Sequence, residues 1–135
     1  MLYSVKKIHL IGIGGIGMSG IAELLFNKNF LITGSDISDS PNVQRLKDLG
    51  IKIFIGHDKK NITNSELVIF SDAIPKNNIE LKEAFNKNLL VYPRAKMISE
   101  IAKLNNSTVG IAGTHGKTTT TSMVGNILQN LNLDP

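Results

Sequence analysis

The sequence predicts an α/β fold built around a doubly wound, mainly parallel β-sheet. Three observations support this prediction. Short apolar runs alternate with segments of helical periodicity along most of the 135 residues. The runs are apolar almost throughout, which is typical of strands covered on both faces. Two of them are followed by glycine-containing turns, at residues 12–17 and 113–116, that lead into predicted helices.

The first predicted strand covers residues 6–11, and the turn at residues 12–17 connects it to a helix. A second strand over residues 30–35 ends next to Asp36. The first helix should pack on the sheet through an apolar face, for which we expect Ile16, Ile21, Ala22, Leu24 and Leu25.

Ser40 and Pro41 predict the start of the second helix, because serine caps helix N-termini and proline is favoured at the first helical position. This helix should end near Leu49, since Gly50 follows. The later elements continue the alternation, with strands expected over residues 51–55, 66–71 and 89–92 and helices over residues 79–86 and 94–104.

A polar break at residues 105–107 separates these elements from the rest of the chain. We place a domain boundary there, between a first domain of residues 1–105 and the start of a second domain at residues 106–135. The second part should contain a strand over residues 108–112, a glycine-containing loop and a helix over residues 117–130. We therefore expect this chain to be the opening part of a larger enzyme.

Residues 12–17 form the pattern G-x-G-x-x-G in the context that this motif requires, after a strand and before a helix. Gly12 would permit the tight turn, Gly14 would let the backbone approach a pyrophosphate, and Gly17 would let the helix pack close to the strand. Asp36 follows at a distance typical of an acid that binds ribose hydroxyls. The pattern predicts a Rossmann-like nucleotide site; the alternative is a tightly packed turn without a ligand.

The second loop, at residues 113–119, predicts a phosphate site for ATP. Lys117 could reach the outer phosphates, and the Thr118 hydroxyl is placed to bind Mg²⁺. The following helix would direct its positive end toward the same anion. The loop departs from the common pattern G-x-x-x-x-G-K-[ST], because Ile111 stands where the first glycine is expected. The alternative is a simple turn before a threonine-rich helix.

Composition narrows the function classes. The chain has a formal net charge of +4, but its lysines are scattered and no basic stripe or aromatic platform suggests nucleic-acid binding. The apolar run after Lys6 is interrupted by glycines, so neither a signal peptide nor a membrane span is expected. The chain contains no cysteine, which suits a reducing compartment. We expect a cytoplasmic protein.

The glycine-rich segments at residues 12–23, 34–36 and 113–119 together resemble the Mur ligase family, and residues 73–75 and 93–95 also resemble landmarks of that family. The resemblance covers nearly the whole chain. It implies a Rossmann-like domain for a UDP-sugar, followed by an ATPase domain and an amino-acid-binding domain, of which this chain would hold the first and the start of the second.

The resemblance also implies the reaction. ATP would phosphorylate the carboxylate of UDP-N-acetylmuramate to an acyl phosphate, and the amine of L-alanine would then attack to give an amide, ADP and phosphate. The L-alanine site would lie outside this chain. By itself, the chain would bind the UDP-sugar without catalysis.

The resemblance assigns site residues by position. Those expected to bind the UDP-sugar are Gly14, Gly15, Ile16, Gly17, Ser35, Asp36, Ser71 and Ala73. Those expected to hold ATP are Gly113, Thr114, His115, Gly116, Lys117, Thr118 and Thr119, with Lys117 as the catalytic residue and Thr118 as the Mg²⁺ ligand.

Five other residues raise separate questions. We expect His9 to be a packed core residue and His57 to be a solvated loop residue. Arg94 could pair with an acidic group of a ligand or form a surface ion pair. Asp72 and Lys96 depart from the family pattern. The family usually has a small polar residue at the position of Asp72 and a glutamate at the position of Lys96.

Two other functions remain open from the sequence. An NAD-dependent oxidoreductase domain would explain residues 12–17 and Asp36 but would leave the loop at residues 113–119 without a role. A nucleotide-binding module without catalytic chemistry would also be compatible with both loops.

Overall fold

The computed structural model describes residues 4–104 and 107–133. It divides into two compact units, Met1–Leu104 and Asn105–Pro135. Two residues of the predicted polar break, Asn105 and Asn106, lie outside the described residues. Within the described ranges, no helix is both long enough and apolar enough to span a bilayer.

The first unit contains one five-stranded sheet in which every neighbouring pair of strands is parallel. The strand order is β3-β2-β1-β4-β5. The predicted doubly wound parallel sheet is therefore confirmed. The strands are β1 (Lys7–Ile11), β2 (Leu31–Asp36), β3 (Lys52–Ile55), β4 (Leu67–Phe70) and β5 (Leu90–Pro93). The helices are α1 (Ile16–Asn27), α2 (Pro41–Asp48), the short 3₁₀ helix η2 (Lys59–Ile62), α3 (Ile79–Asn86) and α4 (Arg94–Ala102).

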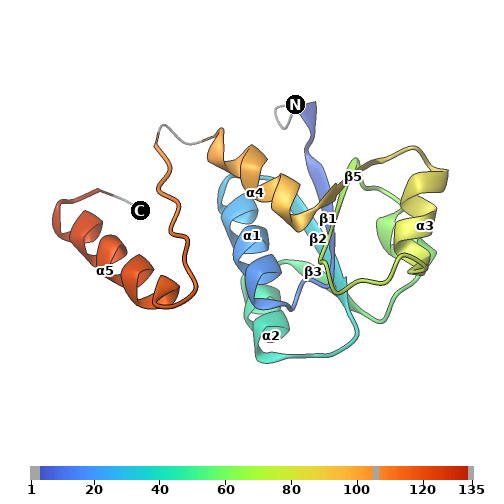
Figure 1. The fold of residues 1–135 in the computed structure, drawn as a ribbon. Helices are drawn as coiled ribbons and strands as arrows, with labels where there is room; N and C mark the ends of the chain where they lie inside the picture. The colour runs from blue at the N-terminus through green and yellow to red at the C-terminus, as the bar shows by residue number, and fades with distance from the viewer. Residues whose placement is uncertain (1–3, 105–106, 134–135) are drawn as a thin grey trace. The chain divides into compact units, whose positions relative to one another are not determined.

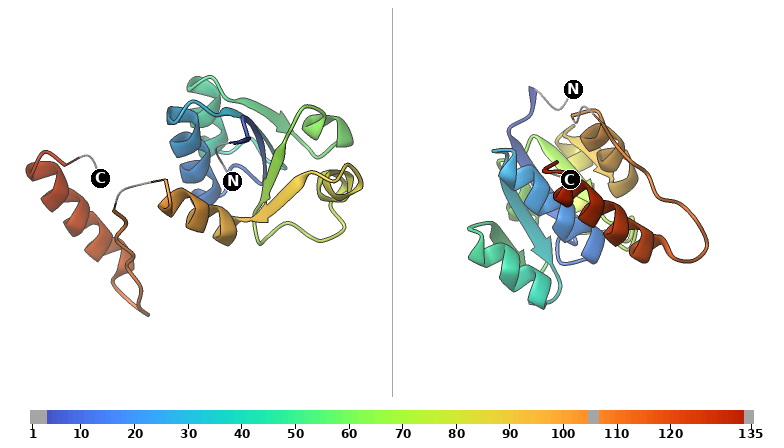
Figure 2. Two further views of the ribbon diagram at one scale, coloured as in Figure 1. Left: turned by 90° about the horizontal axis from the view of Figure 1, so that it is seen from above. Right: turned by 90° about the vertical axis from the view of Figure 1, so that its left-hand side faces the viewer.

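Helices cover both faces of this sheet. Figure 1 and Figure 2 show α1, α2 and α4 on one face and α3 on the other. The larger core cluster lies under α1, α2 and α4 and includes Leu10, Leu25, Leu46, Ile69 and Met97. A smaller cluster lies under α3 and η2 and consists of Ile11, Ile62, Val68, Leu81 and Ala84. Burial on both faces explains why the strands are nearly continuous apolar runs.

Helix α1 buries a different stripe from the predicted one. Its buried residues are Met18, Ser19, Ile21, Ala22 and Leu25. Ile16 and Leu24, which we expected in the core, are 89% and 36% exposed. The spacing i, i+3, i+4, i+7 from Met18 faces the sheet, and Ile16 and Leu24 fall outside that stripe. For these two residues the prediction was wrong.

Side-chain caps fix where two helices begin. The Ser40 hydroxyl accepts a hydrogen bond from the Val43 amide at 3.4 Å, as predicted for an N-cap. Asn78 caps α3 in the same way, with its Oδ1 accepting from the amides of Glu80 and Leu81 at 2.9 and 3.1 Å. This second cap places Glu80 in the first turn of α3.

The second unit contains helix α5 (Lys117–Asn130), with the predicted bounds. The strand predicted over residues 108–112 does not form: residues 107–113 have neither helix nor strand geometry. A strand needs a neighbour for its ladder of hydrogen bonds, and none of the five strands pairs with this segment. An apolar run in the sequence is therefore not sufficient to predict a strand.

Candidate functional site

A cavity of about 500 Å³ lies at the carboxyl ends of the parallel strands. Strands β1 and β4 are neighbours at the point where the strand order reverses, which is where open α/β sheets bind ligands. The cavity is lined by residues that follow four strands: Gly12, Gly14, Gly15, Asp36, Ile37, Ser38, Ser40, His57, Ser71, Ala73, Ile74, Pro75 and Asn78.

The glycine loop after β1 is held in place from several sides. Gly12 has a φ of +77°, in the left-handed region that favours glycine, and its amide donates to the Ser35 carbonyl at 2.8 Å. The Gly14 amide donates to Asp36 Oδ2 at 2.8 Å, and Asn42 Nδ2 donates to the Gly14 carbonyl at 2.9 Å. These contacts fix the loop before any ligand binds.

Gly14 could not be replaced by a larger residue unless neighbouring atoms moved. A Cβ at this position would lie 2.8 Å from Val43 Cγ2 and 2.9 Å from both Asp36 Oδ2 and Ser40 Oγ. The backbone of Gly14 is therefore packed between α2 and the end of β2. In the structure this glycine makes room for neighbouring side chains of the protein, and the approach of its backbone to a pyrophosphate stays a prediction.

The start of α1 offers three free hydrogen-bond donors. Among the described residues, none accepts a hydrogen bond from the backbone amides of Ile16, Gly17 or Met18. No side chain caps this helix, and its first turn contains no acidic residue. Unpaired amides at the positive end of a helix form a suitable site for an anion such as a diphosphate.

Asp36 connects the two loops at this edge of the sheet. Its Oδ2 accepts from the Gly14 amide at 2.8 Å, and its Oδ1 accepts from the Ser38 amide at 3.2 Å. Each carboxylate oxygen can accept more than one hydrogen bond. Asp36 therefore stabilises the loops and keeps acceptor capacity toward the cavity, where ribose hydroxyls are predicted to bind.

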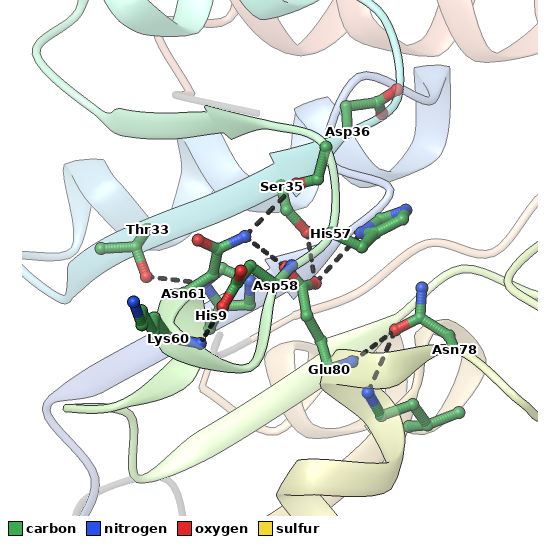
Figure 3. Close-up of polar contacts among 12 residues, drawn as sticks. His9, Thr33, Ser35, Asp36, His57, Asp58, Lys60, Asn61, Asn78 and Glu80 are labelled. Carbon is green, nitrogen blue, oxygen red and sulfur yellow. Dashed lines mark hydrogen bonds and ion pairs between the residues drawn. The ribbon is translucent and has the colours of Figure 1, made fainter.

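Beside the cavity lies a buried polar cluster centred on Glu80, which is fully buried. Figure 3 shows its carboxylate among side chains from separate elements. Ser35 Oγ donates to Oε2 at 2.5 Å, and Asn61 Nδ2 donates to Oε1 at 2.5 Å. His9 Nε2 lies 3.6 Å from Oε2, beyond hydrogen-bond range, and has no hydrogen-bond partner. The fully buried ring of His9 agrees with its predicted core position.

The cluster keeps Glu80 ionised. Burial alone raises the pKa of this carboxyl group, but the His9 ring and the donors on Ser35 and Asn61 outweigh burial and lower the pKa to about 2. Glu80 also lies in the first turn of α3, and the positive end of a helix is favourable for a negative charge. A buried carboxylate is thus stabilised by partners that surround it on several sides.

His57 belongs to both the cluster and the cavity wall. Its side chain is only 16% exposed, so the prediction of a solvated loop histidine was wrong. Its Nδ1 lies 3.2 Å from both Glu80 Oε2 and Ser35 Oγ. Since an ionised carboxylate only accepts hydrogen bonds, Nδ1 carries the proton in this contact. Nε2 of a neutral His57 is then an acceptor.

The loop before α5 has the backbone features of a phosphate loop. Gly113 and Gly116 have φ values of +155° and +74°, and Gly116 precedes the first turn of the helix. Lys117 Nζ donates to the Gly113 carbonyl at 2.7 Å. Among the described residues, none accepts from the backbone amides of Lys117, Thr118 or Thr119. These free amides fit a phosphate ligand.

The structure brings most of the predicted sugar-site residues together. Gly14, Gly15, Asp36, Ser71 and Ala73 line the cavity. Ile16 and Gly17 begin α1, directly after the lining glycines. Ser35 is fully buried, and its hydroxyl contacts Glu80 instead of lining the cavity. The predicted ATP-site residues 113–119 lie together in the second unit.

Sequence analysis missed several residues of this site. They are Ile37, Ser38, Ile74, Pro75 and Asn78 in the cavity wall, Asn42 at the glycine loop, and Asn61 and Glu80 in the buried cluster. Four of them, Ile37, Ser38, Ile74 and Pro75, lie within four residues of the end of a predicted strand, so their position at the carboxyl edge of the sheet was a usable signal. Glu80 gave no such signal.

Comparisons with known proteins agree with one family. A family model described as "Mur ligase family, catalytic domain" matches residues 7–106. UDP-N-acetylmuramate–L-alanine ligase of Agrobacterium fabrum is 54% identical over 98% of this chain and 28% of its own length. The ligase of the same name from Sulfurihydrogenibium sp. is 48% identical over 97% of this chain and 29% of its own length. The chain thus spans less than a third of these relatives.

Solved structures show the same relationship. The crystal structure of UDP-N-acetylmuramate-alanine ligase from Thermotoga maritima has a TM-score of 0.88 and 35% identity, and it covers 93% of this chain and 30% of that chain. A murein peptide ligase from Psychrobacter arcticus has a TM-score of 0.86 and 28% identity over 93% of this chain and 26% of its own.

Proposed function

Because the chain belongs to the Mur ligase family, we propose that it is the UDP-sugar-binding part of an ATP-dependent ligase that joins L-alanine to UDP-N-acetylmuramate in the cytoplasm. The observation that carries this proposal is the cavity at the reversal of strand order, beside three free amides at the start of α1. Such amides favour a diphosphate group.

Different residues at the cavity would bind different parts of the UDP-sugar. The unpaired backbone amides of Ile16, Gly17 and Met18 would bind the diphosphate. The amides of Gly14 and Gly15 were also expected there, but they already donate to Asp36 Oδ2 and to the Gly12 carbonyl. Asp36 accepts from the ribose hydroxyls, and Ser71 and Ala73 form part of the wall. Ser35 would support the site without touching the ligand, because its buried hydroxyl donates a hydrogen bond to Glu80.

The loop at residues 113–119 fits the phosphates of ATP. Its free amides and the Lys117 ammonium bind phosphate oxygens, and Thr118 supplies a hydroxyl for Mg²⁺. The described residues contain no cluster of acidic or histidine side chains that would bind a metal without ATP. When bound, ATP supplies the phosphoryl group that activates the muramate carboxylate as an acyl phosphate.

The amide bond then forms when the amine of L-alanine attacks this acyl phosphate and phosphate leaves. Lys117 would help to neutralise charge on the transferring phosphoryl group, since catalysis of phosphoryl transfer depends mainly on positioning and electrostatic stabilisation. We propose that the chain binds the UDP-sugar by itself and does not complete the reaction.

Titration calorimetry of the chain with UDP-N-acetylmuramate, NAD and ATP, each alone, tests this proposal. We expect the UDP-sugar to bind and NAD to bind more weakly or not at all. The variant Gly14→Ala should lose affinity, because the added Cβ would meet Val43, Asp36 and Ser40. Gly20→Ala in α1 is the control, since its Cβ would meet nothing within 4 Å. NAD binding tighter than UDP-sugar binding would refute the proposal.

A further inference from the structure

A second cavity lies at the opposite edge of the sheet from the cavity proposed for the UDP-sugar. Its volume is about 220 Å³, and the two cavities share no lining residue. The first residues of three neighbouring strands line it, namely Lys7 of β1, Leu31 of β2 and Lys52 of β3. Because these strands are parallel, their first residues all lie at the amino edge of the sheet.

The second cavity lies on the face of the sheet that η2 covers. Thr33 and Phe54 stand two residues further along β2 and β3, so they point to the same face as the first residues of those strands. Residues 60–65, which are most of η2 and the turn after it, supply the rest of the lining apart from Ile8. Figure 3 shows Thr33 and Lys60 on the same side of the buried cluster.

The charged residues that line the second cavity are all lysines: Lys7, Lys52 and Lys60. Among the described residues, none of their three ammonium groups forms an ion pair with a carboxylate. Lys52 Nζ instead lies 5.0 Å from the centre of the Phe54 ring. Like charges around one cavity repel one another, so an anion would be favourable there.

The acidic side chains nearby in the sequence are bound to backbone groups. Glu66 Oε2 accepts hydrogen bonds from the backbone amides of Lys6 and Lys7 at 2.6 and 3.1 Å. Asp58 caps η2, with its Oδ1 accepting from the Lys60 amide at 2.8 Å. These carboxylates therefore hold the backbone beside the cavity and leave the lysine ammonium groups for another anion.

The remaining lining residues suit a small apolar group. Ile8, Leu31 and Phe54 supply apolar surface, and Leu31 is 61% exposed although it begins a central strand. The side chains of Asn64 and Ser65 form no hydrogen bond within the described part of the chain, so both can donate to a ligand. The cavity is smaller than the sites that bind drug-sized molecules, which limits the ligand to about a single ring.

We propose that this cavity is a second binding site, for a small organic anion in which one carboxylate or phosphate group is attached to a ring. The anionic group pairs with the ammonium groups of Lys52 and Lys60, and the ring packs on Leu31 and Phe54. This proposal goes beyond the proposed function and does not depend on it, because the two cavities have separate walls.

Nuclear magnetic resonance of the ¹⁵N-labelled chain locates weak binding residue by residue. Benzoate and phenyl phosphate are the probes, and they distinguish a carboxylate from a phosphate ligand. At least one of them should cause saturable shifts of amide signals at residues 31–33, 52–54 and 60–65, with millimolar affinity. Acetate, which lacks the ring, and benzamide, which lacks the charge, should each bind several-fold more weakly.

The double variant Lys52→Gln, Lys60→Gln tests the charged groups. It should weaken binding of the better probe by about tenfold, which is roughly threefold for each exposed charge pair. The matched control is Lys59→Gln, Lys82→Gln, which removes the same charge from η2 and α3 at positions outside the cavity lining. Its affinity should stay within about twofold of the wild-type value. The dispersion of the amide signals checks that each variant folds, and the single variants replace a double variant that does not.

Three results would overturn this proposal. The first is the absence of saturable shifts with either probe. The second is shifts confined to residues 12–17 or 113–119, since the anion would then bind at the proposed nucleotide sites. The third is an equal loss of affinity in both double variants, which would indicate attraction to net charge alone. The proposed function is tested separately by binding of the UDP-sugar, so either proposal can fail without the other.

Discussion

Glu80 provides the most direct test of how the buried cluster stabilises the fold. Its pKa falls from an ordinary value of 4.5 to about 2 in the folded chain. Each tenfold change in proton affinity corresponds to about 1.4 kcal/mol, so the ionised carboxylate stabilises the folded state by about 3 kcal/mol at neutral pH. Glu80→Gln keeps the shape of the side chain and removes this charge.

The pH dependence follows from the direction of the change. Because the pKa of Glu80 is lower in the folded state, its contribution is complete above pH 4.5 and is lost as the pH falls toward 2. At pH 3 less than about half of it remains. The stability difference between the wild-type chain and Glu80→Gln should therefore shrink by about 2 kcal/mol between pH 7 and pH 3.

Urea unfolding followed by far-ultraviolet circular dichroism measures this difference, since the chain has no tryptophan for fluorescence. Glu83→Gln on the same helix is the control. Glu83 forms a partly exposed ion pair with Lys87, 3.5 Å apart, so its loss should cost less than about 1 kcal/mol. A difference for Glu80→Gln that is the same at pH 7 and pH 3 would refute the reasoning.

Three further substitutions test the packing around the site. Gly34→Ala should destabilise the chain by about 1–3 kcal/mol, because its added Cβ would clash with Ile13 Cδ1. Gly20→Ala is the control and should be neutral or stabilising, since its Cβ would meet nothing within 4 Å. Urea unfolding compares the two variants. Ser40→Ala removes the cap of α2 and should cost about 1 kcal/mol in the same assay. Asn42→Ala frees the carbonyl of the glycine loop, and calorimetry should show several-fold weaker UDP binding; unchanged affinity would mean that this bond does not position the loop.

Local sequence signals predicted much of the fold. The predicted helix bounds at residues 79–86 and 117–130 agree with the structure, in which Asn78 caps the first of these helices and Gly116 directly precedes the second. The five parallel strands agree within one or two residues. The failed strand at residues 108–112 shows the limit of such signals, since strand formation depends on a neighbour that the local sequence does not reveal.

The buried cluster shows the same limit for the site. A glutamate in the first turn of a helix usually faces solvent, so nothing near Glu80 predicts that it is buried. Its partners Ser35 and Asn61 lie 45 and 19 residues away, on β2 and η2. Likewise, only the tertiary arrangement shows that Gly17 faces Arg94.

The Ser35 carbonyl receives hydrogen bonds from both Gly12 and Ile13, just beyond the register in which Ile11 pairs with Ser35. The glycine turn is thus an extension of the sheet's own ladder and not a separate flap. Opening this part of the turn would require breaking both hydrogen bonds to the Ser35 carbonyl. A ligand at this end of the protein would therefore meet a backbone that the sheet already holds in place.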